Sequence, residues 1–289
     1  MEKIKTFGSI FLILLLFPYV CVMLAGRSPS ENGYEILKAD AGNETMPLEA
    51  WVLEILPAQM PADYELEALK AQAVLIRSNL AFRLQEEGRE AEELGHELLD
   101  RWGILYYSLP ELEEIWGEAL FDEYYEKICR AVQETAGRVL TYQGRYVDLP
   151  YHAVSAGKTR SGDLLGEEYS YLKAVECPGD LEAENFLRLV RLESTDSLEI
   201  LSRDEAEYVT EIRQGEASLA GEEFRQEHDL ASSCFTLQEQ DNGWVIATKG
   251  LGHGFGLSMY QAQRQAWQGN TYLEILEYFY TGMECISFS

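Results

Sequence analysis

The sequence predicts an α+β fold, because segments with helical periodicity and segments with strand-like composition are grouped rather than alternating. Residues 66–84 and 112–135 repeat apolar side chains every three or four positions, which is the period of an amphipathic helix. Short β-like runs follow at residues 138–156, 187–213 and 235–249. The last patterns are helical again and occupy residues 259–267 and 272–280. This order favours α+β over a doubly wound parallel sheet.

The N-terminal segment contains an uncharged and largely apolar run at residues 6–26, bounded by Lys3 and Lys5 on one side and by Arg27 on the other. Its 21 residues match the roughly 20 that a membrane-spanning helix needs. They exceed the about 7–15 apolar residues of a signal peptide. We therefore expect residues 1–27 to be a cytoplasmic tip and single membrane anchor, with a cleaved signal peptide as the alternative. The lysines place the remainder of the chain outside the membrane.

Composition divides the rest of the chain into a polar linker at residues 28–45 and one domain at residues 46–289. Residues 46–56 are apolar and of ambiguous type, and residues 85–100 are highly charged, as expected for a solvated helical hairpin or lid. Gln143-Gly144 indicates a hairpin turn. In the first long helix, the predicted inner stripe comprises Leu66, Leu69, Ala73, Ile76 and Leu80. In the second, it comprises Ile115, Leu120, Tyr124, Ile128 and Val132.

The charge of the chain excludes several classes of partner. Lys and Arg total 23 against 50 Asp and Glu, which gives a net charge of −27. Nucleic acid is excluded because phosphate binding needs a basic face. Docking on anionic lipid through a polybasic patch is excluded for the same reason. Without residues 1–27 the net charge is −29, so the outward-facing domain is even more acidic.

The cysteines of the domain do not form a recognisable metal site or disulfide pattern. Cys129, Cys177, Cys234 and Cys285 are widely separated, and no two of them have the spacing of zinc ligands. Four cysteines allow three disulfide pairings, among which a sequence cannot choose. We prefer free or buried thiols.

Two glycine-containing motifs attract attention. Residues 157–159 read Gly-Lys-Thr, but a phosphate-binding loop needs an earlier glycine where this chain has His152. Glycines alternate at positions 250, 252, 254 and 256, and in a strand they would leave one face bare for another backbone or a sugar ring. His253 would then point to the opposite face. Ser155 and Ser258 lack the nucleophile-elbow pattern, so a serine hydrolase is not favoured.

Three stretches, in order, resemble signatures of the SpoIID/LytB family. Residues 56–82 contain Met60-Pro61 followed by LEALKAQAV, residues 151–180 contain YHAVSAGKT and a later YLKAV, and residues 250–285 contain GLGHGFGLSMYQAQ. The resemblance implies a mixed sheet with packed helices in a single domain behind an N-terminal transmembrane helix. It also implies work on peptidoglycan during sporulation and engulfment, as a lytic transglycosylase or an amidase enhancer.

The position of the family's catalytic acid differs in this chain. Members of the family have Glu immediately before the Met-Pro dipeptide, whereas this chain has Gln59. A carboxyl can protonate a glycosidic oxygen and later accept a proton, but an amide can do neither at neutral pH. We therefore expect impaired catalysis. Two alternatives remain: a septal scaffold or amidase enhancer without glycan chemistry, or an active transglycosylase that uses another acid near Gln59, for which the candidates are Glu54, Asp63, Glu65 and Glu67.

The resemblance also implies a site and partners. The expected partners are peptidoglycan glycan strands, a cell-wall amidase and other anchored engulfment proteins. Some members of the family bind zinc through His and Cys; His152 would fit as a ligand, but no Cys follows in its loop, so we expect no cofactor. The expected substrate-binding residues, beside Gln59 at the catalytic position, are Ser155, Gly157, Lys158, Thr159, Gly252, His253, Gly254, Ser258 and Tyr260.

Overall fold

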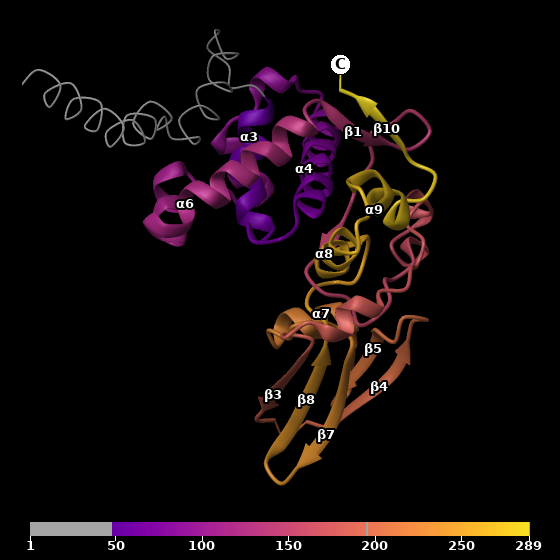
Figure 1. Ribbon diagram of the computed structural model, residues 1–289. Helices are drawn as coiled ribbons and strands as arrows, with labels where there is room; N and C mark the ends of the chain where they lie inside the picture. Colours follow the sequence, from indigo (N-terminus) through magenta and orange to yellow (C-terminus); the bar gives the residue numbers. More distant parts are fainter. Residues whose placement is uncertain (1–47, 195, 289) are drawn as a thin grey trace, which may run out of the picture.

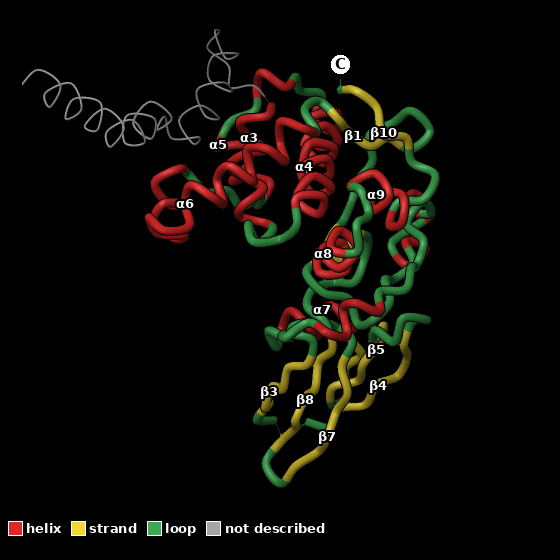
Figure 2. The backbone as a smooth tube through the Cα atoms, viewed as in Figure 1, coloured by secondary structure: helices red, strands yellow, loops and turns green. Residues whose placement is uncertain are grey.

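The computed structural model describes residues 48–194 and 196–288, and it has the mixed α+β composition that the sequence predicts. One end of the molecule is helical, strands extend from the other end, and short helices lie between them (Figure 1). Figure 2 shows the same division by secondary structure. The helices of the helical end are α3 (Leu48–Gln59), α4 (Leu66–Glu87), α5 (His96–Trp102) and α6 (Leu109–Glu134).

The predicted anchor at residues 1–27 and the linker at residues 28–45 lie outside the described residues. In the part of the chain that the structure describes, no helix combines the length and the apolar character needed to cross a membrane.

Helix α4 is buried on two faces, and it joins two parts of the core. Leu69 and Ile76 belong to the predicted stripe and pack in the core formed with α3 and α6. Val74 and Leu75 lie on another face and pack against α8 (Met259–Trp267) and α9 (Tyr272–Phe279). The sequence predicts the first face correctly. The second was not predicted, because a helix that is apolar on two sides has no single amphipathic stripe.

A buried ion pair holds α3 against α4. Arg77 of α4 is fully buried, and its guanidinium donates two hydrogen bonds to the Glu49 carboxylate, at 2.9 and 2.6 Å. The same carboxylate accepts a hydrogen bond of 2.9 Å from the backbone of Gly137. A bidentate pair of this kind has a defined geometry. It therefore orients α3, which ends at Gln59.

Helix α6 confirms the predicted helix but corrects its inner stripe. Ile128 and Val132 are fully buried, whereas Ile115 and Leu120 are 55% and 42% exposed. The reason is Gly117, whose φ of 68° interrupts the helix and changes the direction that the preceding turn faces. A periodic pattern read across such an interruption assigns residues to the wrong face.

The strands form small separate sheets rather than the one mixed sheet that the family resemblance implied. Two of these sheets contain two strands each. In one, β1 (Arg138–Thr141) is antiparallel to β10 (Glu284–Ser287), and in the other, β2 (Tyr151–His152) is parallel to β9 (Leu257–Ser258). Two further sheets contain three antiparallel strands each. Their orders are β3 (Leu187–Leu192), β8 (Gly243–Lys249), β7 (Phe235–Gln240), and β4 (Leu198–Arg203), β5 (Val209–Gln214), β6 (Ala217–Ala220).

The two three-stranded sheets share a core of their own, which explains why they do not merge with the others. Phe235 and Ile246 from one sheet and Ile212 from the other are buried together. Phe224 of α7 (Gly221–Glu227) completes this core. These strands form the extension visible at the lower end of Figure 1.

The predicted turn at Gln143-Gly144 is present, but it does not connect two long strands. Both residues have positive φ, 52° and 74°, which is the geometry of a tight hairpin turn. The turn closes only the bridge between Tyr142 and Arg145, and β1 pairs with β10 instead. Local sequence determined the turn, whereas the partner of the strand was determined by the packing of the C-terminal segment.

The alternating glycines form a loop rather than the strand that the sequence suggested. All four have positive φ, between 67° and 114°, so the chain cannot be extended there. The expected close approach of backbone is nevertheless confirmed. A Cβ at Gly256 would lie 1.7 Å from the carbonyl oxygen of Pro150, and one at Gly250 would lie 2.7 Å from that of Val154. The loop therefore lies directly on residues 150–155.

The charged stretch at residues 85–100 is helical in part. It includes the end of α4, the 3₁₀ turn η1 (Ala91–Glu93) and the start of α5. The cysteines that the structure describes, Cys129, Cys177, Cys234 and Cys285, are free thiols.

Candidate functional site

A cavity of about 330 Å³, which we call the Gln59 cavity, opens at the C-terminal end of α3, between α4 and the segment that leads into β2. This volume is within the range of small-ligand sites. Apolar residues cover part of the wall, and polar residues gather along it. The lining residues are Ile55, Gln59, Ile76, Asn79, Leu80, Arg83, Ile104, Asp148, Leu149, Pro150, Tyr151 and His253.

A hydrogen bond from α4 holds the Gln59 side chain on the wall of this cavity. Its Oε1 accepts a hydrogen bond of 3.2 Å from Nε2 of Gln72, which lies on α4 and is fully buried. Tyr151 lies near the Gln59 side chain and lines the same cavity. The amide is therefore oriented by its hydrogen bond with Gln72, at the position where the resemblance implies an acid.

The segment 148–150 is fixed to the rest of the fold through its backbone. Asn79 of α4 makes two hydrogen bonds with Leu149, donating to the carbonyl oxygen at 3.0 Å and accepting from the amide at 2.8 Å. The Tyr280 hydroxyl donates to the carbonyl oxygen of Pro150 at 2.6 Å. The Tyr171 hydroxyl donates to the carbonyl oxygen of Asp148. These contacts fix the backbone position from which the Asp148 side chain extends.

Asp148 carries the one carboxyl on the wall of this cavity among the residues that the structure describes. Burial raises the pKa of this carboxyl, and the nearby Arg83 guanidinium opposes part of that rise. The Gln59 amide accepts a hydrogen bond from Gln72. The Asp148 carboxyl, by contrast, has no hydrogen bond from a described residue that would lower its pKa. Asp148 is thus a half-buried acid whose main charged neighbour is Arg83.

His152 and His253 lie close together, with ring centroids 5.7 Å apart. His152 is buried, its Nδ1 is 3.0 Å from the carbonyl oxygen of Phe255, and its Nε2 has no partner among the described residues. Burial lowers the pKa of His152 to about 3, and burial also lowers the pKa of His253. Both rings are therefore neutral at pH 7. Within the described ranges, no three His, Cys, Asp or Glu side chains are grouped to hold a metal ion.

Asp180 forms a second polar centre, which we call the Asp180 junction. Its carboxylate accepts hydrogen bonds from the Ser155 backbone N–H at 2.7 Å and from the Ser258 hydroxyl at 2.8 Å. Ser258 also caps α8 by accepting a hydrogen bond from the N–H of Gln261. Burial raises the pKa of Asp180 to about 6, although these donors lower it in part. The junction joins the second and third family-like stretches.

The predicted site residues are therefore divided between two places. Gln59 and His253 line the cavity, whereas Ser155 and Ser258 belong to the junction and are buried. Thr159 is buried as well, and its hydroxyl accepts a hydrogen bond from the backbone of Val175.

The other predicted residues surround these two places, and among them Gly254 is buried, whereas Gly157, Lys158, Gly252 and Tyr260 are partly exposed. Lys158 pairs with Glu176 at 3.3 Å, and Tyr260 donates to a backbone carbonyl at 3.4 Å. The three glycines are close to other groups: a Cβ at Gly157 would meet Leu181, one at Gly252 would meet His152, and one at Gly254 would meet Tyr208.

The four alternative acids are outside the cavity. Glu54 is hydrogen-bonded with His96 at 2.8 Å, and Glu67 contacts Lys70 and the backbone of Tyr272. Asp63 and Glu65 are exposed. None of the four lines the wall on which Gln59 lies.

The sequence patterns missed Asp148, Arg83 and Asn79, which line the same cavity as Gln59. Asn79 and Arg83 are four residues apart on α4, so they share a face of the helix. That spacing was visible in the sequence. Asp148 had no comparable signal, because its neighbours in space come from segments distant along the chain.

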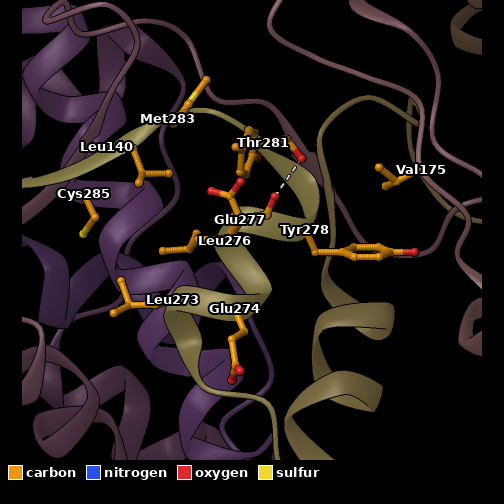
Figure 3. Close-up of a pocket in the computed structure, with 11 residues that line it drawn as sticks. Leu140, Val175, Leu273, Glu274, Leu276, Glu277, Tyr278, Thr281, Met283 and Cys285 are labelled. Atoms are coloured by element: carbon orange, nitrogen blue, oxygen red, sulfur yellow. Dashed lines mark hydrogen bonds between the residues drawn. The ribbon is translucent and has the colours of Figure 1, made fainter.

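A second cavity, of about 720 Å³, is larger and has a different character. It is lined mainly by apolar side chains, including Leu140 of β1, Leu276 of α9 and Met283, which directly precedes β10 (Figure 3). The Thr281 hydroxyl donates to the carbonyl oxygen of Glu277 at 2.9 Å on its rim. None of the predicted site residues lines it.

Comparisons with known proteins agree with the resemblance. Residues 38–142 match the family described as SpoIID, stage II sporulation protein. The chain is 27% identical over 285 residues to stage II sporulation protein D of Bacillus subtilis, covering 89% of this chain and 82% of that protein. It is 28% identical over 258 residues to the protein of the same name from Bacillus amyloliquefaciens, covering 83% and 74%.

A more distant relative has a different name. The amidase enhancer of Bacillus subtilis is 21% identical over 305 residues, which cover 81% of this chain and 40% of that protein. Matches that cover 83% and 89% of the chain extend well beyond the Met-Pro stretch, and they include Gln59, Asp148 and Asp180. The chain is therefore similar over most of its length to stage II sporulation protein D, and residues 38–142 carry the match to the SpoIID family.

Proposed function

We propose that this chain is a membrane-anchored sporulation protein that binds peptidoglycan glycan strands in the Gln59 cavity and remodels them during engulfment. The observation that carries the proposal is the cavity itself, in which Gln59 at the family's catalytic position lies beside Arg83 and Tyr151. Amide, guanidinium and phenol groups hydrogen-bond sugar hydroxyls and N-acetyl groups. Because the domain is strongly acidic, long-range attraction to an anionic wall cannot supply the affinity, and local contacts must do so.

Cleavage through the family's route is impaired in this proposal. The Gln59 amide neither releases nor accepts a proton at neutral pH, and its hydrogen bond with Gln72 is that of a neutral group. Loss of a positioned general acid costs roughly 10²–10⁴-fold in rate. Binding does not depend on the acid, so it is retained.

The proposed location follows from the expected anchor at residues 6–26. A tether of this kind raises the effective concentration of the domain beside the wall. The proposed partners are a cell-wall amidase, which would supply strands without stem peptides, and other anchored engulfment proteins. The similarity to the amidase enhancer favours a second candidate, in which the chain stimulates an amidase without any glycan chemistry of its own.

A sedimentation experiment tests glycan binding. Purified full-length chain is mixed with glycan strands from which an amidase has removed the stem peptides, and the bound fraction is measured. We expect Arg83→Met to weaken binding about tenfold, because a charged hydrogen bond contributes about 1.5 kcal/mol or more. The matched control is Arg213→Met, which removes an exposed guanidinium on β5 and should leave binding unchanged.

The outcomes separate the candidates. Wild-type chain that does not sediment with the strands would overturn the glycan-binding proposal. Stimulation of an amidase by a chain that does not bind strands would support the second candidate instead.

A further inference from the structure

The Gln59 cavity contains an acid that the packing of the protein does not use. Asp148 lies on the cavity wall with Gln59 and Tyr151, and its backbone is held by Tyr171 and, through Leu149, by α4. Its carboxylate makes no ion pair within 4.0 Å in the described part of the chain. A charged group that is half buried without a partner costs free energy. Packing alone therefore does not explain why a carboxylate lies at this place.

Tyr151 connects Asp148 with the position of the missing acid. Tyr151 lies close enough to both Gln59 and Asp148 to interact electrostatically with each of them. The three side chains thus form one group on one cavity wall. A sugar that contacts Gln59 would have the Asp148 carboxyl among its neighbours.

We propose that Asp148 is the proton donor for the residual glycan cleavage by this chain, in the cavity where Gln59 replaces the family's acid. The inference rests on the proposed function, because it requires that glycan strands bind in this cavity. It concerns a residue that is distant in sequence from the Met-Pro dipeptide, and it assigns Gln59 a role in holding the sugar.

The proposed step balances without a co-reactant. Protonated Asp148 donates its proton to the oxygen that links the two sugars, and the bond from that oxygen to C1 of the muramic acid breaks. The 6-hydroxyl of the same muramic acid then forms a bond to C1 and returns its proton to the Asp148 carboxylate. The products are a strand end with a free hydroxyl and a 1,6-anhydro end, and no water is consumed.

The surroundings of Asp148 determine the pH range of this step. Burial favours the protonated acid, and Arg83 of α4 favours the ionised form, with burial the larger effect on the pKa. The tyrosines around it are neutral in the acidic to neutral range, because burial raises the pKa of each: Tyr151, Tyr169, Tyr171 and Tyr280. Burial lowers the pKa of His253, which also lines the cavity. The rate should therefore fall as pH rises through the pKa of Asp148.

The test measures 1,6-anhydro ends by mass spectrometry after incubation of full-length chain with strands that lack stem peptides. We expect slow product formation by the wild type, a decrease of about 10²-fold in Asp148→Asn, and partial activity in Asp148→Glu. Sedimentation with the strands should be the same for all three. Asp122→Asn, an exposed residue of α6, is the matched control and should not change the rate.

A double variant protects the test against misfolding. Gln59→Glu should create fast cleavage, and Gln59→Glu combined with Asp148→Asn should remain fast, because the carboxyl introduced at position 59 then supplies the proton. That result would show that Asp148→Asn leaves the cavity intact. Unchanged product in Asp148→Asn alone, or no product from wild type that binds strands, would overturn the inference about Asp148. Wild type that fails to bind strands would instead count against the proposed function.

Discussion

The Gln59 cavity and the Asp180 junction are built from neighbouring segments, yet the carboxyl groups in the two places differ in burial and in hydrogen bonding. Asp180 is fully buried and accepts hydrogen bonds from Ser155 and Ser258, so its oxygens are occupied. Asp148 is half buried, lines the cavity and has the charge of Arg83 nearby. Burial raises the pKa of both. A raised pKa therefore indicates a catalytic role only when the carboxyl is accessible to a ligand.

The glycine loop supports both regions, and disturbing it should have the largest effect. Gly256→Ala would place a Cβ 1.7 Å from the carbonyl oxygen of Pro150 at a φ of +67°. We expect a loss of about 4 kcal/mol in the free energy of unfolding, measured by denaturant titration. Gly269→Ala is the matched control, because Gly269 also has positive φ but has no atom within 4 Å of the added Cβ. It should cost about 1 kcal/mol. Equal losses in the two variants would contradict the role of close backbone packing.

The pH dependence of stability should sharpen the distinction between the two carboxyls. The folded-state pKa of Asp180 is about 6, above its ordinary value, so the folded protein retains a proton that the unfolded chain has already released. The free energy of unfolding should therefore decrease as pH rises from about 4 to about 6, by at most about 3 kcal/mol.

Asp180→Asn tests this assignment. The substitution removes the titration while keeping an acceptor for the Ser155 N–H, so the decrease between about pH 4 and about pH 6 should become smaller. Thermal unfolding at several pH values measures it, with Asp122→Asn as the exposed control. A pH profile identical to that of wild type would show that Asp180 is not the group responsible.

Restoring the family's acid should show how the cavity differs from the junction. Gln59→Glu places a second carboxyl beside Tyr151 and should increase the formation of 1,6-anhydro ends about 10²-fold. The gain corresponds to about 2.7 kcal/mol in activation free energy. Gln85→Glu, on an exposed part of α4, is the control and should have no effect. No gain in Gln59→Glu, with strand binding preserved, would argue that the cavity cannot position a cleavable bond.

Lys158 should have the smallest effect of the predicted site residues. Its ammonium pairs with Glu176, which is 71% exposed, and exposed pairs contribute about 0–1 kcal/mol. Lys158→Ala should change the free energy of unfolding by less than about 0.5 kcal/mol and weaken strand binding less than Arg83→Met does. A larger loss of binding than that of Arg83→Met would move the main contact from the cavity to the Lys158 loop.

Several features of the fold could be predicted from the sequence because they depend on neighbouring residues. The periodicity of residues 66–84 predicted most of α4, and the patterns after residue 258 predicted α8 and α9 with bounds close to those observed. The turn at Gln143-Gly144 was correct for the same local reason. The predicted inner stripe of α6 was wrong around Gly117, where a single backbone conformation changes which residues face the core.

The candidate site was predictable only in part. Gln59 was identified from the dipeptide that follows it, which is a local signal. The glycine loop was taken for a strand, because alternation predicts a face but does not reveal that packing against residues 150–155 imposes positive φ. Ser155 and Ser258 were expected at the substrate, but their hydrogen bonds with Asp180 became evident only in the structure.

The sequence by itself therefore determined the composition class, the long helices, the resemblance carried by three collinear stretches and the amide at position 59, where that resemblance implies an acid. The tertiary structure decided which polar groups lie together. Asp148 shares a cavity with Gln59 because Asn79, Tyr171 and Tyr280, which are far from it in the chain, hold the backbone of residues 148–150. A carboxyl's environment depends on such distant contacts, since burial and hydrogen bonding are set by neighbours in space.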